Sequence, residues 1–136
     1  MNERIVALDI GDARIGVAVS DPSRTIAAPV EVINRVGWGP DTRKICEICR
    51  RYDTMQILSG LPLNMDGSEG FQAKKVRDFC AQLEKAGLTV YFQDERLSTV
   101  AAENSMLSAD LSRADRKSRV DKVAAAIFLQ EWLNRQ

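Results

Sequence analysis

The N-terminal stretch that decides the fold reads IVALDIGDARIGVAVSD (residues 5–21). Its first part, residues 5–10, is a short apolar run closed by Gly11, which is typical of a buried strand. Apolar residues at positions 15, 17 and 19 then alternate with small ones before an Asp-Pro pair, which indicates a second strand after a tight turn. With a third strand expected at Val30–Asn34, this region predicts an antiparallel meander.

Helices and strands are expected to alternate through the rest of the chain. In order, the pattern predicts a helix from Asp41 or Thr42 to Tyr52, a strand Met55–Leu58, a turn-rich loop Leu61–Gly70, a helix from Ser68 to Ala86 with Gly87 as its C-cap, a strand Thr89–Gln93, a short helix Ser98–Leu107, a polar stretch 108–119 and a helix Val120–Asn134. Three antiparallel strands followed by α-β-α-β units predict an α/β fold with a five-stranded mixed sheet flanked by helices. No internal repeat or linker is visible, so we expect one domain over residues 1–136.

The composition limits the classes of partner. Hydrophobic residues make up 45% of the 136 residues, enough for a real core, and 19 Lys and Arg balance 19 Asp and Glu. No global positive field therefore attracts a phosphate backbone, and any contact with nucleic acid must come from a local patch. No apolar stretch approaches 18 residues, and no signal-peptide pattern follows Met1. We expect a cytoplasmic protein with no membrane partner.

The cysteines are expected to be structural. Cys46 and Cys49 form a C-x-x-C pair, which is also found in redox and zinc sites. The chain has no histidine and no second pair that would complete a tetrahedral zinc site. We interpret the three cysteines, Cys80 included, as reduced side chains that pack as small apolar groups. The absence of histidine also excludes catalysis by imidazole.

Several acidic residues stand at the ends of buried elements. Asp9 interrupts an apolar strand, where a buried carboxylate without a cationic partner costs several kcal/mol. Asp94 and Glu95 follow the strand 89–93, at the strand end where open α/β sheets place ligands. Asp121 lies in the first turn of an apolar helix, where an acid also simply favours the helix dipole. Each acid alone can be structural, and together they suggest a site only if they converge.

Four motifs in order along the chain resemble those of the YqgF/RuvX family. They are Leu8–Ala18 with Ser20 and Asp21, Gly60–Gly70, Asp94–Thr99 with Ala102, and Lys117 with Asp121, Ala124 and Ala125. The resemblance covers essentially the whole chain. The family is similar to Holliday-junction resolvases of the RuvC type within the RNase H-like superfamily, and it is associated with maturation of the 5′ end of pre-16S rRNA.

The resemblance implies an RNase H-like fold in which Asp9, Glu95 and Asp121 meet as catalytic residues and metal ligands. Three oxygen ligands suit Mg²⁺ or Mn²⁺, and two weakly bound ions would activate a water and stabilise the leaving oxygen of a phosphodiester. The implied activity is that of a metal-dependent nuclease, a hydrolase acting in rRNA processing and ribosome biogenesis. The choice of Glu95 over Asp94 rests on the family pattern.

Candidate substrate contacts come from two single arginines, one basic segment and one glycine-rich loop, and each has an alternative role. Arg14 and Arg96 each neighbour a proposed ligand, and could neutralise that carboxylate or contact the scissile strand. Residues 112–122 carry Arg113, Arg116 and Lys117, which either bind nucleic acid or form a solvated face. The loop 60–70 either makes tight turns or holds a phosphate on amides near Ser68. We expect a nucleic-acid partner and a monomer or weak homodimer.

Three other functions compete with rRNA processing. The first is a resolvase acting on four-way DNA junctions, which the sequence does not separate from an RNA nuclease. The second is an actin-like ATPase, because Asp9-Ile10-Gly11 also resembles a phosphate loop of that superfamily, but one lobe of this length does not enclose ATP. The third is a non-catalytic ribosome-assembly or transcription-associated factor on the same scaffold.

Overall fold

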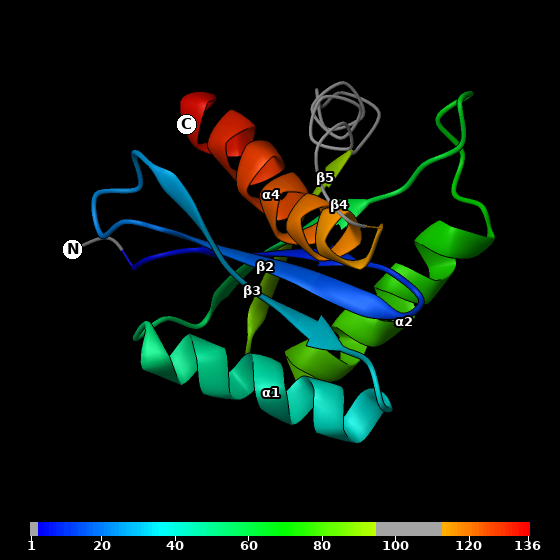
Figure 1. Cartoon of the computed structure of the whole chain (residues 1–136), viewed down its shortest axis with the longest axis horizontal. Coiled ribbons are helices and arrows are strands. Elements are labelled where there is room, and N and C mark those ends of the chain that lie inside the picture. Colours follow the sequence, from blue (N-terminus) through cyan, green and yellow to red (C-terminus); the bar gives the residue numbers. More distant parts are fainter. Residues whose placement is uncertain (1–2, 95–112) are drawn as a thin grey trace.

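The computed structural model describes residues 3–94 and 113–136, the latter with side chains from residue 123 onward (Figure 1). Its elements are β1 (Val6–Ile10), β2 (Arg14–Ser20), β3 (Ala27–Asn34), α1 (Trp38–Arg51), β4 (Gln56–Leu61), α2 (Phe71–Lys85), β5 (Thr89–Asp94) and α4 (Arg113–Asn134). The short helix expected at 98–107 lies outside the described residues.

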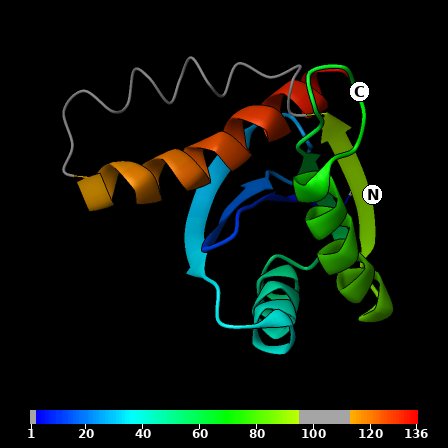
Figure 2. The same ribbon diagram turned by 90° about the vertical axis from the view of Figure 1, so that its right-hand side faces the viewer.

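The five strands form one mixed sheet in the order β3-β2-β1-β4-β5. The first three strands pair antiparallel, and β4 and β5 continue the sheet in parallel from β1. Helices α1 and α2 cover one face, and α4 crosses the other (Figures 1 and 2). The predicted five-stranded mixed sheet is confirmed.

Both faces of the central strand are buried, which explains why its sequence is almost continuously apolar. Val6 and Leu8 of β1 belong to the cluster formed with α1 and α2. Ile5 and Ala7 belong to a second cluster with Phe128 and other apolar residues of α4. The alternation along β1 therefore divides the sheet into an α1/α2 face and an α4 face.

Helix α1 begins earlier than the sequence predicted. The sequence predicts an N-cap at Asp41 or Thr42, but the helix starts at Trp38 and Gly37 is its N-cap. The Asp41 side chain is buried and turns back toward the preceding connection, where its Oδ2 lies 3.2 Å from Nε of Arg35 and its Oδ1 accepts a hydrogen bond from the Val36 amide at 3.1 Å. The carboxylate that the sequence pattern assigned to capping thus forms a part-buried ion pair instead.

Helix α4 is also longer than predicted. The polar stretch expected up to residue 119 is helical from Arg113. Ala, Arg and Lys are good helix formers, and neither Gly nor Pro interrupts this segment. The first turns of α4 extend beyond the sheet at β3 (Figure 2), so their helicity was not visible as an amphipathic core pattern.

Smaller differences concern the ends of other elements. β3 begins at Ala27, three residues early, because an edge strand tolerates Pro29. β4 continues to Leu61, and α2 begins at Phe71 instead of Ser68. The end of α2 fits the sequence, since Gly87 follows the C-cap with φ of 101°, a conformation that favours glycine.

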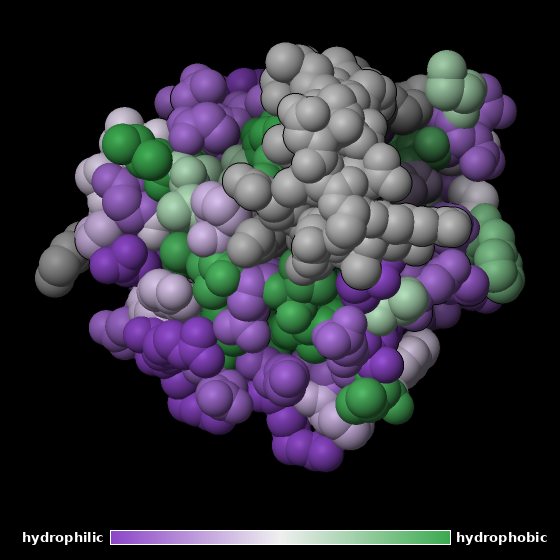
Figure 3. Space-filling view, viewed as in Figure 1, coloured by the Kyte–Doolittle hydropathy of each residue, from purple (hydrophilic) through white to green (hydrophobic). Residues whose placement is uncertain are grey.

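The surface seen in Figure 3 is largely hydrophilic, with hydrophobic areas between the polar residues. Within the described ranges, no helix has both the length and the hydropathy needed to cross a bilayer. Some large hydrophobic side chains are nevertheless exposed, among them Val36 and Trp38, which line the same pocket.

The cysteines are free thiols within or beside the core, as the sequence predicted. Burial raises the pKa of Cys49 to about 12 and that of Cys80 to about 11. Because the thiolate is the reactive form, these two thiols should react slowly with a disulfide reagent at pH 8, and partly exposed Cys46 should react faster.

Cys46→Ala and Cys49→Ala should leave cleavage unchanged and lower the free energy of unfolding modestly. Stoichiometric zinc in purified protein, lost in these variants, would contradict this interpretation.

The turn after β2 should make stability depend on pH. The amide of Ile26, the hydroxyl of Ser23 and the amide of Thr25 donate to the Asp21 carboxylate, which lowers its pKa from 3.8 to about 2. Since the folded pKa is depressed, this contribution to stability is present above about pH 4 and is lost as the pH falls toward 2. NMR titration of the Asp21 carboxyl should give a midpoint near 2, and a midpoint near 4 would contradict the assigned hydrogen bonds.

Candidate active site on the α4 face

Asp9 lies near the C-terminal end of the central strand, on the α4 face. It is half-buried and stands opposite Gly16 of β2. Two residues earlier on the same side of β1, Ala7 packs in the cluster with α4. Alternation along the strand therefore places the Asp9 carboxylate on the face that α4 covers.

The register of β5 distinguishes the two acids at its end. Gln93 pairs with Gly60, and Asp94 pairs with Leu61. Leu61 packs in the cluster of α1 and α2. The Gln93 side chain instead reaches the residue that follows α4, and its Oε1 accepts a hydrogen bond from Nη2 of Arg135 at 2.7 Å. Asp94 is thus on the opposite face from Asp9. The alternation of the sequence does not decide between Asp94 and Glu95 as the metal ligand. The structure places Asp94 away from the α4 face. Glu95 lies outside the described residues.

Gln93 was not singled out from the sequence. Its side chain is only 4% exposed, and its Nε2 has no hydrogen-bond partner within the described part of the chain. Leaving such a donor unpaired costs free energy, so buried amides of this kind often mark sites that bind a further group. No signal in the sequence marks it, because Gln93 follows Thr89 and Tyr91 at the alternate positions of a strand whose intervening positions are apolar.

The helix that carries Asp121 lies on the same face. Ala124 and Ala125, a turn further along α4, are buried, and Ala125 packs in one cluster with Ala7 and Ala18. The structure therefore brings the backbone of α4 onto the sheet face that bears Asp9. The side chain of Asp121 lies outside the described residues.

Arg14 shares the Asp9 face as well. It begins β2, and Gly16 separates it from Ala18, which packs under α4. Since Gly16 is the cross-strand partner of Asp9, Arg14 is the diagonal neighbour of the carboxylate. This position fits either role expected for Arg14. Arg96 and the side chains of Arg113, Arg116 and Lys117 are outside the described residues.

The glycine-rich loop after β4 is organised by its own hydrogen bonds. The Ser68 amide donates to Oδ1 of Asp66 at 2.9 Å, and the Asn64 amide donates to the carbonyl of Ser68 at 2.9 Å. Gly67 has φ of 89°, and a Cβ on Gly70 would lie 2.9 Å from Oδ1 of Asn64. The Ser68 amide is therefore already satisfied, which favours the tight-turn role over the phosphate-binding one.

The expected metal site would be built from carboxylates. No group of three acidic, cysteine or histidine residues able to hold a metal occurs among residues 3–94 and 123–136. Of the three expected ligands, Asp9 alone has a described side chain. With no histidine in the chain, carboxylate oxygens are the available hard ligands, and these suit Mg²⁺ or Mn²⁺.

Similar proteins are known both in sequence and in fold. The model of the family described as "RuvX: Holliday junction resolvase" matches residues 3–135. Proteins named "Putative pre-16S rRNA nuclease" from Clostridium botulinum strain Hall and Clostridium perfringens strain SM101 are each 47% identical, over 96% and 97% of both chains.

Solved structures with a similar fold include Thermus thermophilus RuvC in complex with a Holliday junction, with a TM-score of 0.59, 14% identity and coverage of 98% of this chain and 96% of that one. Fowlpox virus resolvase has a TM-score of 0.53, 12% identity and coverage of 96% and 98%. The fold is thus that of the RNase H-like nucleases, and the chain belongs to the RuvX family.

Proposed function

We propose that this chain is a divalent-metal-dependent nuclease that hydrolyses phosphodiester bonds at the 5′ end of pre-16S rRNA in the cytoplasm. The observation that carries the proposal is the position of Asp9, a half-buried carboxylate near the end of the central strand on the face covered by α4. Membership of the RuvX family supplies the class of reaction.

The metal would be held by Asp9, Glu95 and Asp121. When bound, divalent ions supply a nucleophilic water and stabilise the charge on the leaving oxygen. Glu95 is preferred over Asp94 because Asp94 stands on the α1/α2 face. Arg14, the diagonal neighbour of Asp9, would hold a phosphate of the substrate strand near that carboxylate.

A second candidate substrate is the four-way DNA junction, because the matching family model is named for a Holliday junction resolvase. RNA is preferred because relatives with 47% identity over nearly the whole chain are named for pre-16S rRNA. The likeness to junction-bound RuvC at 14% identity shows only the fold.

Cleavage of the two substrates side by side tests the proposal. A pre-16S rRNA fragment with its 5′ extension and a four-way DNA junction should be incubated with equal amounts of protein in Mg²⁺ and in Mn²⁺. Faster cleavage of the RNA supports rRNA processing, and faster cleavage of the junction supports the resolvase. No cleavage of either substrate would leave the non-catalytic factor as the better account.

The first turns of α4 are the proposed contact for substrate phosphates. Helical spacing places positions 113, 116 and 117 on one side of the helix. The backbone of these first turns extends beyond the sheet at β3 (Figure 2). Replacing Arg113, Arg116 and Lys117 with alanine should weaken nucleic-acid binding with little change in Tm. Each phosphate contact removed should flatten the slope of log affinity against log salt by about 0.7 to 0.9. An unchanged slope in a salt series would show that this segment is only a solvated face.

A further inference from the structure

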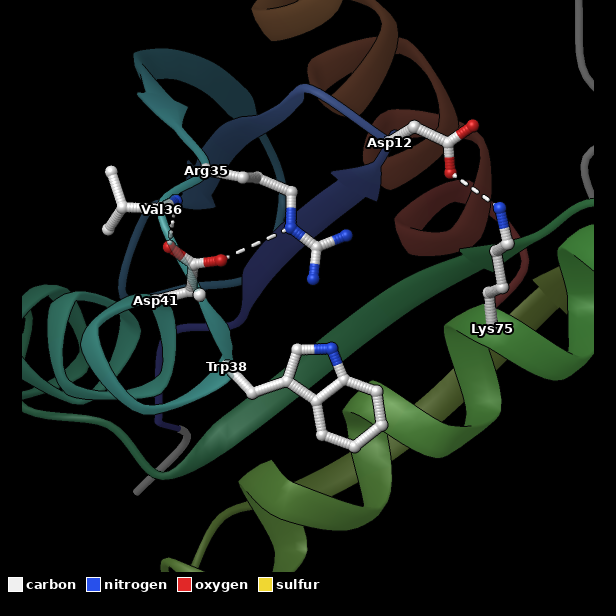
Figure 4. Close-up of a pocket in the computed structure, with 7 residues that line it drawn as sticks. Asp12, Arg35, Val36, Trp38, Asp41 and Lys75 are labelled. Atoms are coloured by element: carbon white, nitrogen blue, oxygen red, sulfur yellow. Dashed lines mark hydrogen bonds and ion pairs between the residues drawn. The ribbon is translucent and has the colours of Figure 1, made fainter.

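A pocket lies on the α1/α2 side of the β1–β2 turn, whereas Asp9 lies on the α4 side of the sheet. The pocket of about 430 Å³ opens between the turn and helices α1 and α2, a size within the usual range for small-ligand sites. Its lining includes Asp12, Arg35, Val36, Trp38, Asp41 and Lys75 (Figure 4). None of these residues has a role in the proposed metal site.

The charged side chains of the pocket neutralise one another. Nε of Arg35 lies 3.2 Å from Oδ2 of Asp41, and Nζ of Lys75 lies 3.3 Å from Oδ1 of Asp12 (Figure 4). Two cations and two anions leave the lining with no net charge. Such a lining offers hydrogen-bond donors and acceptors to a base inside the pocket. Of its two cations, Lys75 has the more exposed side chain, 46% against 16% for Arg35.

Trp38 provides a fixed aromatic surface at the pocket. Its side chain is 49% exposed, and its ring meets buried Phe79 edge-on with centroids 6.5 Å apart and an interplanar angle of 71°. The guanidinium of Arg35 stacks on Phe79 at 4.8 Å, which holds that ring in turn. A Trp ring that is anchored on one side and exposed on the other is suited to stack on a planar ligand.

Basic and aromatic groups continue outward from the pocket. Nζ of Lys75 lies 4.5 Å from the ring centre of Phe71, whose side chain is 76% exposed. The Lys75 side chain is itself 46% exposed, so its amine can exchange Asp12 for another anion. An aromatic platform next to an exposed cation is the combination that binds unpaired nucleotides, the base on the ring and the phosphate on the cation.

We propose that this pocket binds one unpaired nucleotide of the nucleic-acid substrate, with its base stacked on Trp38 and its phosphate at Lys75. The inference rests on the proposed nuclease function. The pocket is tied to the active-site strand, because Nη1 of Arg35 donates to the carbonyl of Gly11 at 2.9 Å, two residues after Asp9. The β1–β2 turn thus joins the strand that carries Asp9 to the pocket, and the proposed path of the substrate strand crosses this turn.

Fluorescence tests the stacking directly. The chain has two tryptophans, so a Trp132→Phe variant leaves Trp38 as the only reporter. Single-stranded RNA and DNA of one sequence, and the matching duplexes, should be titrated in EDTA so that cleavage does not interfere. Single strands should quench Trp38 at lower concentrations than duplexes, and the RNA and DNA arms show which of the two the pocket takes. Equal quenching by single strands and duplexes would overturn the proposal. So would a change in Trp38 fluorescence that follows the protein concentration and not the concentration of nucleic acid.

Affinity measurements provide the second test. Trp38→Ala should weaken single-strand binding roughly 5- to 150-fold, and Trp38→Tyr should restore most of it, because stacking needs only an aromatic ring. Met55→Ala, which truncates a 52%-exposed side chain away from this pocket, is the matched control and should bind as the wild type. Unchanged affinity in a folded Trp38→Ala protein that still cleaves would overturn the pocket alone. Absence of cleavage by the wild type would instead overturn the proposed function.

Discussion

Asp9→Asn is expected to reduce the rate of phosphodiester cleavage by at least about a hundredfold. Losing a residue that only supports a metal ligand costs about 10- to 100-fold, so losing a direct ligand should cost more. The fold should persist, because asparagine has the shape of aspartate and Asp9 is only half-buried. Single-turnover cleavage in Mg²⁺ measures the rate, and calorimetry with Mn²⁺ should show weaker binding.

Asp53→Asn is the matched control for this substitution. Asp53 is exposed, lies in the turn after α1 and has φ of 53°, a conformation that asparagine adopts as readily as aspartate. The same chemical change there should leave the cleavage rate and metal binding at wild-type levels. Undiminished cleavage by Asp9→Asn would remove that residue from the active site.

Phe128→Ala is expected to give the largest loss of stability, about 3–5 kcal/mol. The ring is 1% exposed and belongs to the cluster that attaches α4 to the sheet face bearing Asp9. For a chain of this length, such a change should lower Tm by on the order of 10 °C or more in a thermal melt.

Ile26→Ala serves as the comparison for this loss. Ile26 is 62% exposed, so the same kind of truncation should change the free energy of unfolding by no more than about 0.5 kcal/mol. Equal losses in the two variants would show that α4 does not pack on the sheet as described.

The strand pattern predicted most of the fold, because burial on both sides of a central strand leaves a clear apolar run. The apolar patterns at residues 5–10 and 15–19 predict the first two strands, which the structure has at Val6–Ile10 and Arg14–Ser20. Element ends were harder to predict where a distant contact decides them. Asp41 has the residue type of an N-cap, but pairing with Arg35 draws its carboxylate away from the helix amides.

The candidate site was predictable in part. Asp9 is conspicuous as a carboxylate in an apolar strand, and its place on the α4 face agrees with that signal. The face on which Asp94 lies depends on how β5 aligns with β4, which no local pattern contains. The Trp38 pocket was missed because Asp12, Trp38 and Lys75 come from three separate segments that only the folded chain brings together.

The most direct test of the central claim compares the two neighbouring acids at the end of β5. We predict that Glu95→Gln abolishes divalent-metal-dependent cleavage, because Glu95 is the proposed ligand that follows the strand. Asp94→Asn should cleave within about threefold of the wild type, since Asp94 pairs with Leu61 on the opposite face from Asp9. Loss of cleavage in Asp94→Asn together with normal cleavage in Glu95→Gln would contradict an active site on the α4 face.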